Sequence, residues 1–458
     1  MDRRTFIAAG MGLAAARPAL ALPAAQPRED WSALAGKVKA AMKWAWGEYR
    51  RVAWGQDEVK PVSGGGQSFL IPGASVGLSI VEALDTLWLM GLDAELEDGI
   101  RWIHRHLTFD LDGEAQVFEA SIRLVGGLLS GHLATGDARL LELAHDLATR
   151  MQPCFDTPTG MPRRYVHLQT GRTRDAESFP AEIGGGMAPE YVTLSRLTGE
   201  KRFGKAAVDA MLALHARRSR IGLVPDTIDV DSGRAVSRRA TIGPPSDSYY
   251  EYLWDTWRLT GDVRCRDAYR ASIAAILARQ ADRTTGRLWF ANVDYETGAR
   301  IDLRQSELSG YFPGLLSEGG DHAAGVAAMA GWIAAQDRYG VIPESFDPTD
   351  WSIRSARNAL RPELADGAFA LWLHDRDERW RHVVARHFRL MMAKNRAAHG
   401  FSGLTDVRTG AQDDACPGYW WSEQMKYYWL IFSDTKRFDY RDNYLSTEGN
   451  VLRGFRSA

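Results

Sequence analysis

The chain has 458 residues, with 56 lysines and arginines against 58 aspartates and glutamates and a formal net charge of −2. This balance gives no overall attraction to nucleic acid or to an anionic membrane, so we expect neither as a partner. Hydrophobic residues make up 45% and charged residues 25% of the chain, which excludes disorder throughout. Three cysteines without a CxxC pair support neither a disulfide framework nor a cysteine-rich zinc site.

The first element in chain order is a predicted export signal. Arg3 and Arg4 precede a short apolar stretch at 6–16 and a small-residue site at 19–21. This order is typical of a twin-arginine signal peptide, which we place at residues 1–21; a disordered cationic tail is the alternative. Export by the twin-arginine route predicts a periplasmic or secreted protein that folds before transport.

A repeat of about 62 residues follows the signal. Its mark is a short turn between two helical patterns, found at 134–137, 197–200 and 259–262, with a degenerate copy at 373–375. Extended segments between the repeats carry Gly-containing turns that predict β-hairpins, at 169–171, 231–233, 296–298 and 408–410. The unit is therefore helix, turn, helix, hairpin. Several such units stacked side by side can close into a ring around a shared core.

The helices before and after each turn differ in charge. Those after the turn, such as 200–218, carry a charged face opposite an apolar stripe, which predicts an outer ring. Those before the turn are poor in charge, which predicts an inner ring buried on both sides. The inner helices carry carboxylates near their N-terminal ends: Glu119, Glu190, Asp247, Glu363 and Glu423. Because equivalent ends meet at one mouth of a ring, we predict a shared acidic site, as glycoside hydrolysis requires.

Single carboxylates of this set also have structural interpretations. Asp247 follows Ser246 at a helix start, where aspartate is a common cap. Glu363 follows Pro362, and proline followed by an acid is ordinary chemistry for the first helical turn. Glu119 is harder to explain structurally, because it interrupts an apolar face and has Arg123 four residues on as a partner.

The sequence at these positions resembles a known family. The strings VFEASIRLVGGLLSGHLATGD, DSYYEYLWDTWRLTGD, LRPE (360–363), SEQMKYYWLIFSD and LSTEGN are similar, in this order, to those of class I α-1,2-mannosidases of glycoside hydrolase family 47. The resemblance covers about residues 35–450, and with the export signal it suggests a bacterial member. It implies an all-α fold with small β-hairpins, an (α/α)7 barrel of inner and outer helices. We expect residues 29–458 to form this single catalytic domain.

The family resemblance also implies an activity. Its members are calcium-dependent, inverting exo-α-1,2-mannosidases, so the expected substrate is a mannose-containing oligosaccharide and the expected cofactor is Ca²⁺. We expect this chain to act as a monomer. Two alternatives stay open: a mannose-binding, lectin-like relative with little hydrolysis, and an α/α-barrel hydrolase for another sugar.

Roles transfer by position within the matching motifs. Glu119 resembles the catalytic acid, Glu363 the general base that activates water, and Asp247 a third essential carboxylate that competes with Glu119 for the acid role. Thr447 matches the threonine that binds calcium through its hydroxyl and carbonyl oxygens. Further positions match residues that contact the sugar or the calcium-bound waters: Arg123, Glu190, Arg361, Tyr419, Glu423 and Glu448.

Three departures from the family pattern concern the same region. Glu307 stands where the family has histidine and is expected at the substrate, and Gly310 replaces a disulfide cysteine. Asp366 is a shortened acidic residue, and Pro244 and Pro245 stand near a position that sets branch choice in some relatives. These changes bear on linkage and on branch preference.

Overall fold

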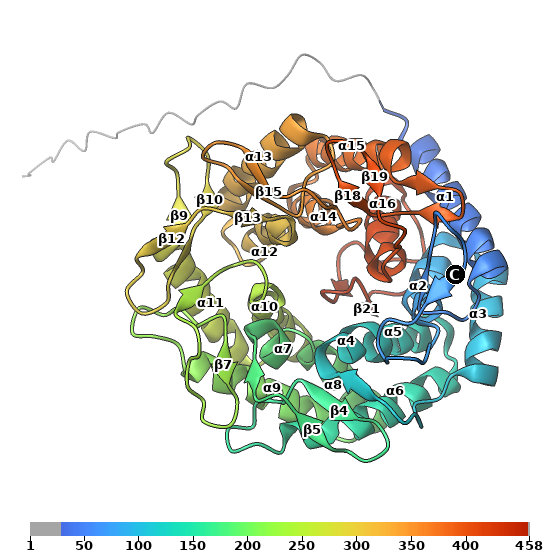
Figure 1. The fold of residues 1–458 in the computed structure, drawn as a ribbon, viewed down its shortest axis with the longest axis horizontal. Helices are drawn as coiled ribbons and strands as arrows, with labels where there is room; N and C mark the ends of the chain where they lie inside the picture. Colours follow the sequence, from blue (N-terminus) through green and yellow to red (C-terminus); the bar gives the residue numbers. More distant parts are fainter. Residues whose placement is uncertain (1–28, 457–458) are drawn as a thin grey trace, which may run out of the picture.

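The computed structural model describes residues 29–456, which form two concentric rings of helices. Figure 1 shows the chain running once around the barrel, from blue through green to red, so that its first and last helices, α1 and α16, lie side by side. The expected barrel of inner and outer helices is confirmed. The expected signal peptide at 1–21 lies outside the described residues.

Within residues 29–456 the outer ring has seven helices and the inner ring has seven helical segments. The outer helices are α1 (Trp31–Val52), α3 (Asp93–His106), α6 (Ala138–Met151), α9 (Arg202–Ala216), α11 (Val263–Arg279), α13 (His322–Tyr339) and α15 (Glu378–Lys394). The inner segments are α2 (Leu78–Met90), α4–η1–α5 (Val117–Thr135), α8 (Ala188–Thr198), α10 (Asp247–Thr260), α12 (Phe312–Glu318), α14 (Glu363–Asp375) and η4–α16 (Trp420–Phe432). Short helices η2 (Gln152–Phe155), α7 (Pro180–Gly184) and η3 (Glu307–Tyr311) lie in the connections.

The repeated turns end one helix and begin the next. Gly136, Gly199 and Gly261 take the left-handed conformation that ends an inner helix. Asp137 and Asp262 then begin the outer helix, since each side chain accepts a hydrogen bond from a backbone N–H two residues on. The sequence turn therefore encodes the change from inner to outer ring.

Short antiparallel strands connect the helices at one end of the barrel (Figure 1). The pairs are β1 (Glu58–Val59) with β2 (Gly66–Gln67), β6 (Glu177–Ser178) with β7 (Ile228–Asp229), β9 (Ala281–Asp282) with β10 (Trp289–Phe290), β16 (Arg396–Ala397) with β17 (Gly400–Phe401), and β18 (Leu404–Asp406) with β19 (Ala411–Gln412). The three-stranded sheets are β3 (Glu114–Gln116), β4 (Tyr165–His167) and β5 (Thr173–Arg174); β8 (Arg239–Ala240), β11 (Asn292–Asp294) and β12 (Arg300–Asp302); and β13 (Gln305–Ser306), β14 (Ser345–Asp347) and β15 (Ser352–Ser355).

Three of the predicted turns, at 169–171, 296–298 and 408–410, join paired strands. The turn at 231–233 is flanked by a single bridge, between Ile228 and Ala235. There β7 pairs instead with β6, so the predicted local hairpin is replaced by a longer-range pairing.

The last hairpin, β20 (Tyr444–Leu445) with β21 (Val451–Arg453), lies inside the inner ring (Figure 1). The backbone N–H of Val451 donates to Asp85 of α2 at 3.0 Å, and the Asn450 amide donates to the carbonyl of Ile122 at 2.7 Å. Gly126 permits this approach, because a Cβ atom there would lie 2.4 Å from the Asn450 amide nitrogen. The hairpin turn, residues 446–450, is thereby held in the middle of the barrel.

Two further observations concern the chain as a whole. Among residues 29–456, none of the helices is both long and apolar enough to cross a membrane. Cys154, Cys265 and Cys416 are all buried and all unpaired. Their burial among apolar side chains raises the pKa of each thiol, as expected for structural cysteines.

Candidate active site

A cavity of about 330 Å³ lies where the N-terminal ends of the inner helices meet. Four of the five inner-helix carboxylates line it: Glu119, Asp247, Glu363 and Glu423. Glu119 ends the short helix α4, Asp247 and Glu363 are the first residues of α10 and α14, and Glu423 lies in η4. The predicted convergence of acidic side chains at one mouth of the ring is therefore present.

Arg123 joins three of the acidic side chains at this mouth. Its guanidinium donates to Glu119 at 2.6 Å and to Glu82 of α2 at 2.9 Å, and it also contacts Glu448 from the hairpin turn. Burial raises the pKa of the Glu82 and Glu448 carboxyls, against the lowering effect of Arg123. Three acidic side chains thus share the Arg123 guanidinium.

Both Glu119 and Glu423 lie at wide, π-helical turns. Residues 120–125 follow Glu119 directly in such a turn, and residues 420–424 contain Glu423. A π-helical turn inserts an extra residue into an α-helix and is frequent at functional sites, since it redirects the side chains around it. Sequence periodicity alone does not reveal these turns, because the flanking residues keep an ordinary helical pattern.

Asp247 and Glu363 begin their helices without being ordinary caps. Burial raises the pKa of Asp247 to about 6 and that of Glu363 to about 7, although nearby Arg361 lowers both. One oxygen of Glu363 is buried and has no hydrogen-bond partner within residues 29–456. An unpartnered buried carboxylate oxygen is costly in a resting structural role, which favours a functional role for this residue.

Tyr419 forms an aromatic wall between two arginines. The Arg123 and Arg361 guanidiniums lie 5.5 and 5.3 Å from the centre of its ring. The Tyr419 hydroxyl donates to the carbonyl of Ala359 at 2.5 Å, which fixes the ring. Arg361 is itself held by a two-bond ion pair with Glu344, at 3.0 and 3.2 Å. The arrangement offers a rigid aromatic ring and fixed donors to a sugar.

Thr447 lies on the cavity wall, at the tip of the hairpin turn. Its neighbours supply oxygen atoms of the kind that hard cations prefer: Glu251 is close to Thr447, and one oxygen of Glu190 is buried and has no hydrogen-bond partner within residues 29–456. Among residues 29–456, no group of three or more His, Cys, Asp or Glu side chains is arranged to hold a metal directly. Thr447 and the carboxylates around it are oxygen donors, which is the chemistry that a hard cation such as Ca²⁺ takes directly or through water.

Two predicted substrate-binding residues do not line the cavity. Glu190 is fully buried behind it, where the Tyr252 hydroxyl donates to it at 2.6 Å and burial raises its pKa to about 8. Glu307, in η3, is 1% exposed and is likewise absent from the cavity wall. The remaining predicted residues all lie at the cavity: Arg123, Arg361, Tyr419, Glu423, Thr447 and Glu448.

Motif reasoning from the sequence missed several residues of the site. Glu251 lines the cavity four residues after Asp247, and Glu82 reaches Arg123 from α2. Both are carboxylates on inner helices that are otherwise poor in charge, which is the signal that identified the other five. Asp366, noted only as a departure, also lines the cavity, and burial with the Glu318 and Glu363 charges raises its pKa to about 8.

Comparison with known proteins places this site in a family. The model of glycosyl hydrolase family 47 matches residues 41–454. This chain belongs to glycosyl hydrolase family 47. The family predicted from the sequence motifs is thus confirmed, and with it the assignment of the chain as a glycoside hydrolase.

Curated relatives agree with the family assignment. The chain is 30% identical to mannosyl-oligosaccharide 1,2-alpha-mannosidase MNS1 of Arabidopsis thaliana, over 91% of this chain and 78% of the relative. It is 32% identical to mannosyl-oligosaccharide 1,2-alpha-mannosidase IB of Mus musculus, over 87% and 66% of the two chains.

A solved structure supports the fold of this family 47 chain. It is similar to an α-1,2-mannosidase from Trichoderma reesei, with a TM-score of 0.84, 20% identity and coverage of 93% of this chain and 99% of the other. At this identity the likeness supports the barrel fold alone.

Proposed function

We propose that this chain is an exo-α-1,2-mannosidase that removes terminal mannose from oligosaccharides, by an inverting and calcium-dependent reaction. The observation that carries the proposal is one cavity lined by Glu119, Asp247, Glu363 and Thr447, the full set expected of a catalytic family member. The hairpin β20–β21 lies inside the inner ring (Figure 1), and Thr447 and Glu448 of its turn line this cavity.

Glu363 is the proposed general base. Inversion needs a carboxylate that removes a proton from water on the face opposite the leaving group. A buried carboxylate with a pKa of about 7 is a better proton acceptor than an exposed one and is about half ionised at neutral pH. Its unpartnered oxygen is available to accept that proton.

The proton donor is Glu119 or Asp247. Glu119 accepts a hydrogen bond from the Arg123 guanidinium at 2.6 Å, which holds its carboxyl at the cavity wall. Asp247 has a pKa raised to about 6, which favours proton retention. The two side chains lie on different inner helices that face the same cavity, so either is placed to protonate the glycosidic oxygen, directly or through water.

Calcium is the proposed cofactor. Thr447, with the surrounding carboxylates acting through water, would hold it. When bound, Ca²⁺ supplies positive charge that binds sugar hydroxyls and balances the acidic cluster. The chain's own residues orient the sugar: Tyr419 against the ring, and Arg123 and Arg361 beside it.

Linkage assays test this proposal directly. The purified protein is incubated with α-1,2-, α-1,3- and α-1,6-mannobiose, and free mannose is measured before and after chelation of calcium. We expect release from the α-1,2 substrate alone, lost with chelator and restored by calcium. Preference for another linkage, or release that chelation does not change, would contradict the assignment. Mannobiose binding without release would indicate the lectin-like alternative.

We also propose that the protein is exported to the periplasm or the medium. The support is the twin-arginine pattern at residues 1–21. Replacement of Arg3 and Arg4 by lysine should retain the protein in the cytoplasm, as cell fractionation would show; unchanged export would contradict this route.

A further inference from the structure

Glu307 is a buried carboxyl that the proposed reaction does not use. It lies in η3, is 1% exposed and does not line the cavity. One of its oxygens accepts a hydrogen bond from the Asn358 amide at 2.8 Å, and the other has no partner within residues 29–456. Burial of a carboxyl with a single hydrogen bond costs more free energy than burial of a hydrophobic residue at the same position, which indicates that this carboxyl has a role.

Asn358 connects Glu307 to the segment that precedes the proposed base. Its amide also donates to the carbonyl of Ile342 at 3.0 Å, and its side-chain oxygen accepts the backbone N–H of Leu360 at 3.0 Å. Leu360 has a φ of 59°, in the left-handed region that a branched side chain rarely adopts. The Asn358 side chain therefore fixes a strained backbone three residues before Glu363.

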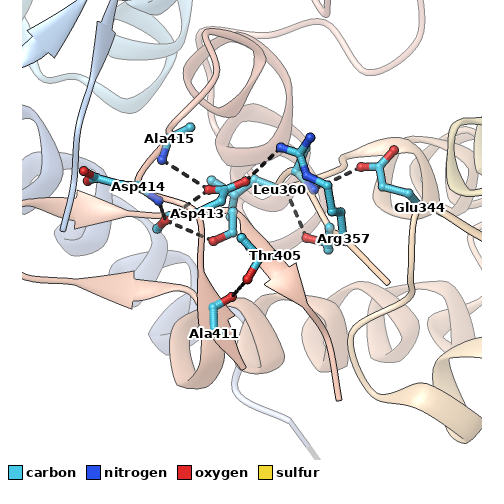
Figure 2. A network of polar contacts seen from close by, with 12 residues as sticks. Glu344, Arg357, Leu360, Thr405, Ala411, Asp413, Asp414 and Ala415 are labelled. Carbon is cyan, nitrogen blue, oxygen red and sulfur yellow. Dashed lines mark hydrogen bonds and ion pairs between the residues drawn. The ribbon is translucent and has the colours of Figure 1, made fainter. Parts of the chain in front are cut away.

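Other contacts hold the same segment from its remaining sides. Figure 2 shows this network, in which Arg357 pairs with Asp413 at 3.2 Å and Glu344 accepts the backbone N–H of Ala359 at 3.1 Å. Asn358 further exchanges backbone hydrogen bonds with Leu404, at 2.9 and 2.7 Å. The network fixes residues 357–361 before the helix α14 begins.

The helix that carries Glu307 also packs directly on the start of α14. A Cβ atom at Gly310 would lie 3.0 Å from the backbone nitrogen of Leu364 and 3.1 Å from the carbonyl carbon of Glu363. In a 3₁₀ helix, residues three apart share one face, so Glu307 and Gly310 face the same way. The absence of a side chain at Gly310 permits this contact between η3 and the base-bearing helix.

We propose that Glu307 is a positioning residue for Glu363: its buried carboxyl holds Asn358, which holds the backbone at Leu360 and thereby places the base. This inference rests on the proposed function of Glu363. It replaces the expectation that Glu307 contacts the sugar.

The charges around Glu307 favour the protonated, neutral form of its carboxyl. Burial and the carboxylates of Glu344 and Glu363 raise the pKa of Glu307 well above its usual range, against a smaller lowering effect of Arg361 and Asn358. A protonated Glu307 leaves the charge of the base undisturbed. Glutamine, which has the same shape and is always neutral, should therefore replace it.

The test compares E307Q with E307L and with N358A and the double variant E307L/N358A. We measure kcat and KM on α-1,2-mannobiose, the pH profile, melting temperature and backbone hydrogen exchange over residues 357–366. E307Q should keep kcat within about twofold and leave the acidic limb of the profile unmoved by more than about 0.3 pH units. E307L should lower kcat about tenfold or more, with a smaller change in KM, because a misplaced base acts in the transition state.

The double variant and the hydrogen exchange each test the proposal separately. The double variant should be no worse than the worse single variant, since both act through one contact; additive losses would overturn the proposal. Hydrogen exchange over 357–366 should rise in E307L and stay unchanged in E307Q. Equal exchange in both, or a shifted acidic limb in E307Q, would also overturn it. If the wild type releases no mannose, the proposed function fails, while the exchange data still decide the positioning role.

Discussion

At the scale of single residues, Glu119 and Glu363 line the same cavity but differ in their hydrogen-bond partners. Glu119 is fixed by Arg123 at 2.6 Å, whereas Glu363 keeps one buried oxygen without a partner among residues 29–456. A carboxylate that is hydrogen-bonded to an arginine is held in one position, whereas one with an open oxygen can accept a proton from water. This difference, rather than burial alone, assigns the base to Glu363.

Glu363→Gln should abolish turnover while the fold remains. The amide has the same shape but cannot accept a proton from water, and loss of a general base costs on the order of 10²–10⁴ in rate. Initial rates on α-1,2-mannobiose measure the loss, and the melting temperature verifies folding. The matched control is Glu344→Gln, which alters the Arg361 ion pair and should lower the rate less. Near-normal activity of the Glu363 variant would remove the base assignment.

The pH profile provides a second check on Glu363. A base works only when ionised and a proton donor only when protonated, so kcat/KM should rise with pH along the limb that Glu363 controls, with a midpoint near its pKa of about 7, and should fall again as the donor loses its proton. Bound calcium adds positive charge, which lowers carboxylate pKa values, so the midpoint of this limb should lie at or below about 7. A rate that falls steadily between pH 5 and 7 would be incompatible with a carboxylate base at this site.

At the scale of elements, the sequence predicts the helices with long, patterned segments and misses the short or unmarked ones. Low charge before each turn identified the inner segments at η1–α5, α8, α10, α14 and η4–α16. The turns that follow α2 and α12 were not recognised from the sequence, because Gly91-Leu92-Asp93 and Gly319-Gly320-Asp321 lack the Thr-Gly pattern.

The family resemblance, rather than the repeat, supplied the count of seven. The sequence predicted the site about as well as it predicted the helices. Four carboxylates reach the cavity as expected, because helix ends in a ring must converge. The burial of Glu307 behind the wall was beyond prediction, since it depends on how η3 packs on α14.

A buried ion pair also supports the C-terminal hairpin. Lys426 of α16 pairs with Asp85 of α2 at 2.7 Å, both side chains being almost fully buried, and also contacts the carbonyl of Gly449 in the hairpin turn. Lys426→Met should destabilise the fold by about 3–5 kcal/mol, because Asp85 would be left buried without its cation. It should also weaken calcium binding, because Thr447 lies two residues from Gly449.

Denaturant unfolding and calcium titration measure both effects of the Lys426 substitution. The control is Lys43→Met, since Lys43 is 64% exposed and pairs with Glu95 at the surface. Its loss should change the free energy of unfolding by less than about 1 kcal/mol. Equal effects of the two substitutions would show that the hairpin does not depend on the buried pair.

At the scale of the whole molecule, the interior of the barrel contains more acidic than basic side chains. Burial raises the pKa of the enclosed carboxyls: Glu82, Glu190, Glu251, Asp366, Glu423 and Glu448. With pKa values above those of the unfolded chain, the folded protein binds more protons than the unfolded one. Its free energy of unfolding without calcium therefore falls as pH rises from about 4.5 to about 8, the pKa of Glu190 and Asp366.

Calcium should therefore stabilise the protein more at high pH than at low pH. At pH 8 more of the carboxyls are ionised than at pH 5.5, so the cation offsets more repulsion there, whereas protonated carboxyls bind it poorly. Melting temperatures with calcium and with chelator, at both pH values, measure the difference. A calcium-induced shift that is equal at the two pH values, or larger at pH 5.5, would contradict the role of the acidic cluster.

The most direct test of the account is the configuration of the first product. Proton NMR follows the purified protein with α-1,2-mannobiose, in calcium and again after chelation. An inverting reaction, in which Glu363 activates water on the face opposite the leaving group, predicts that β-mannose appears first and that chelation stops its release. Initial appearance of α-mannose would contradict the inverting reaction and the role given to Glu363.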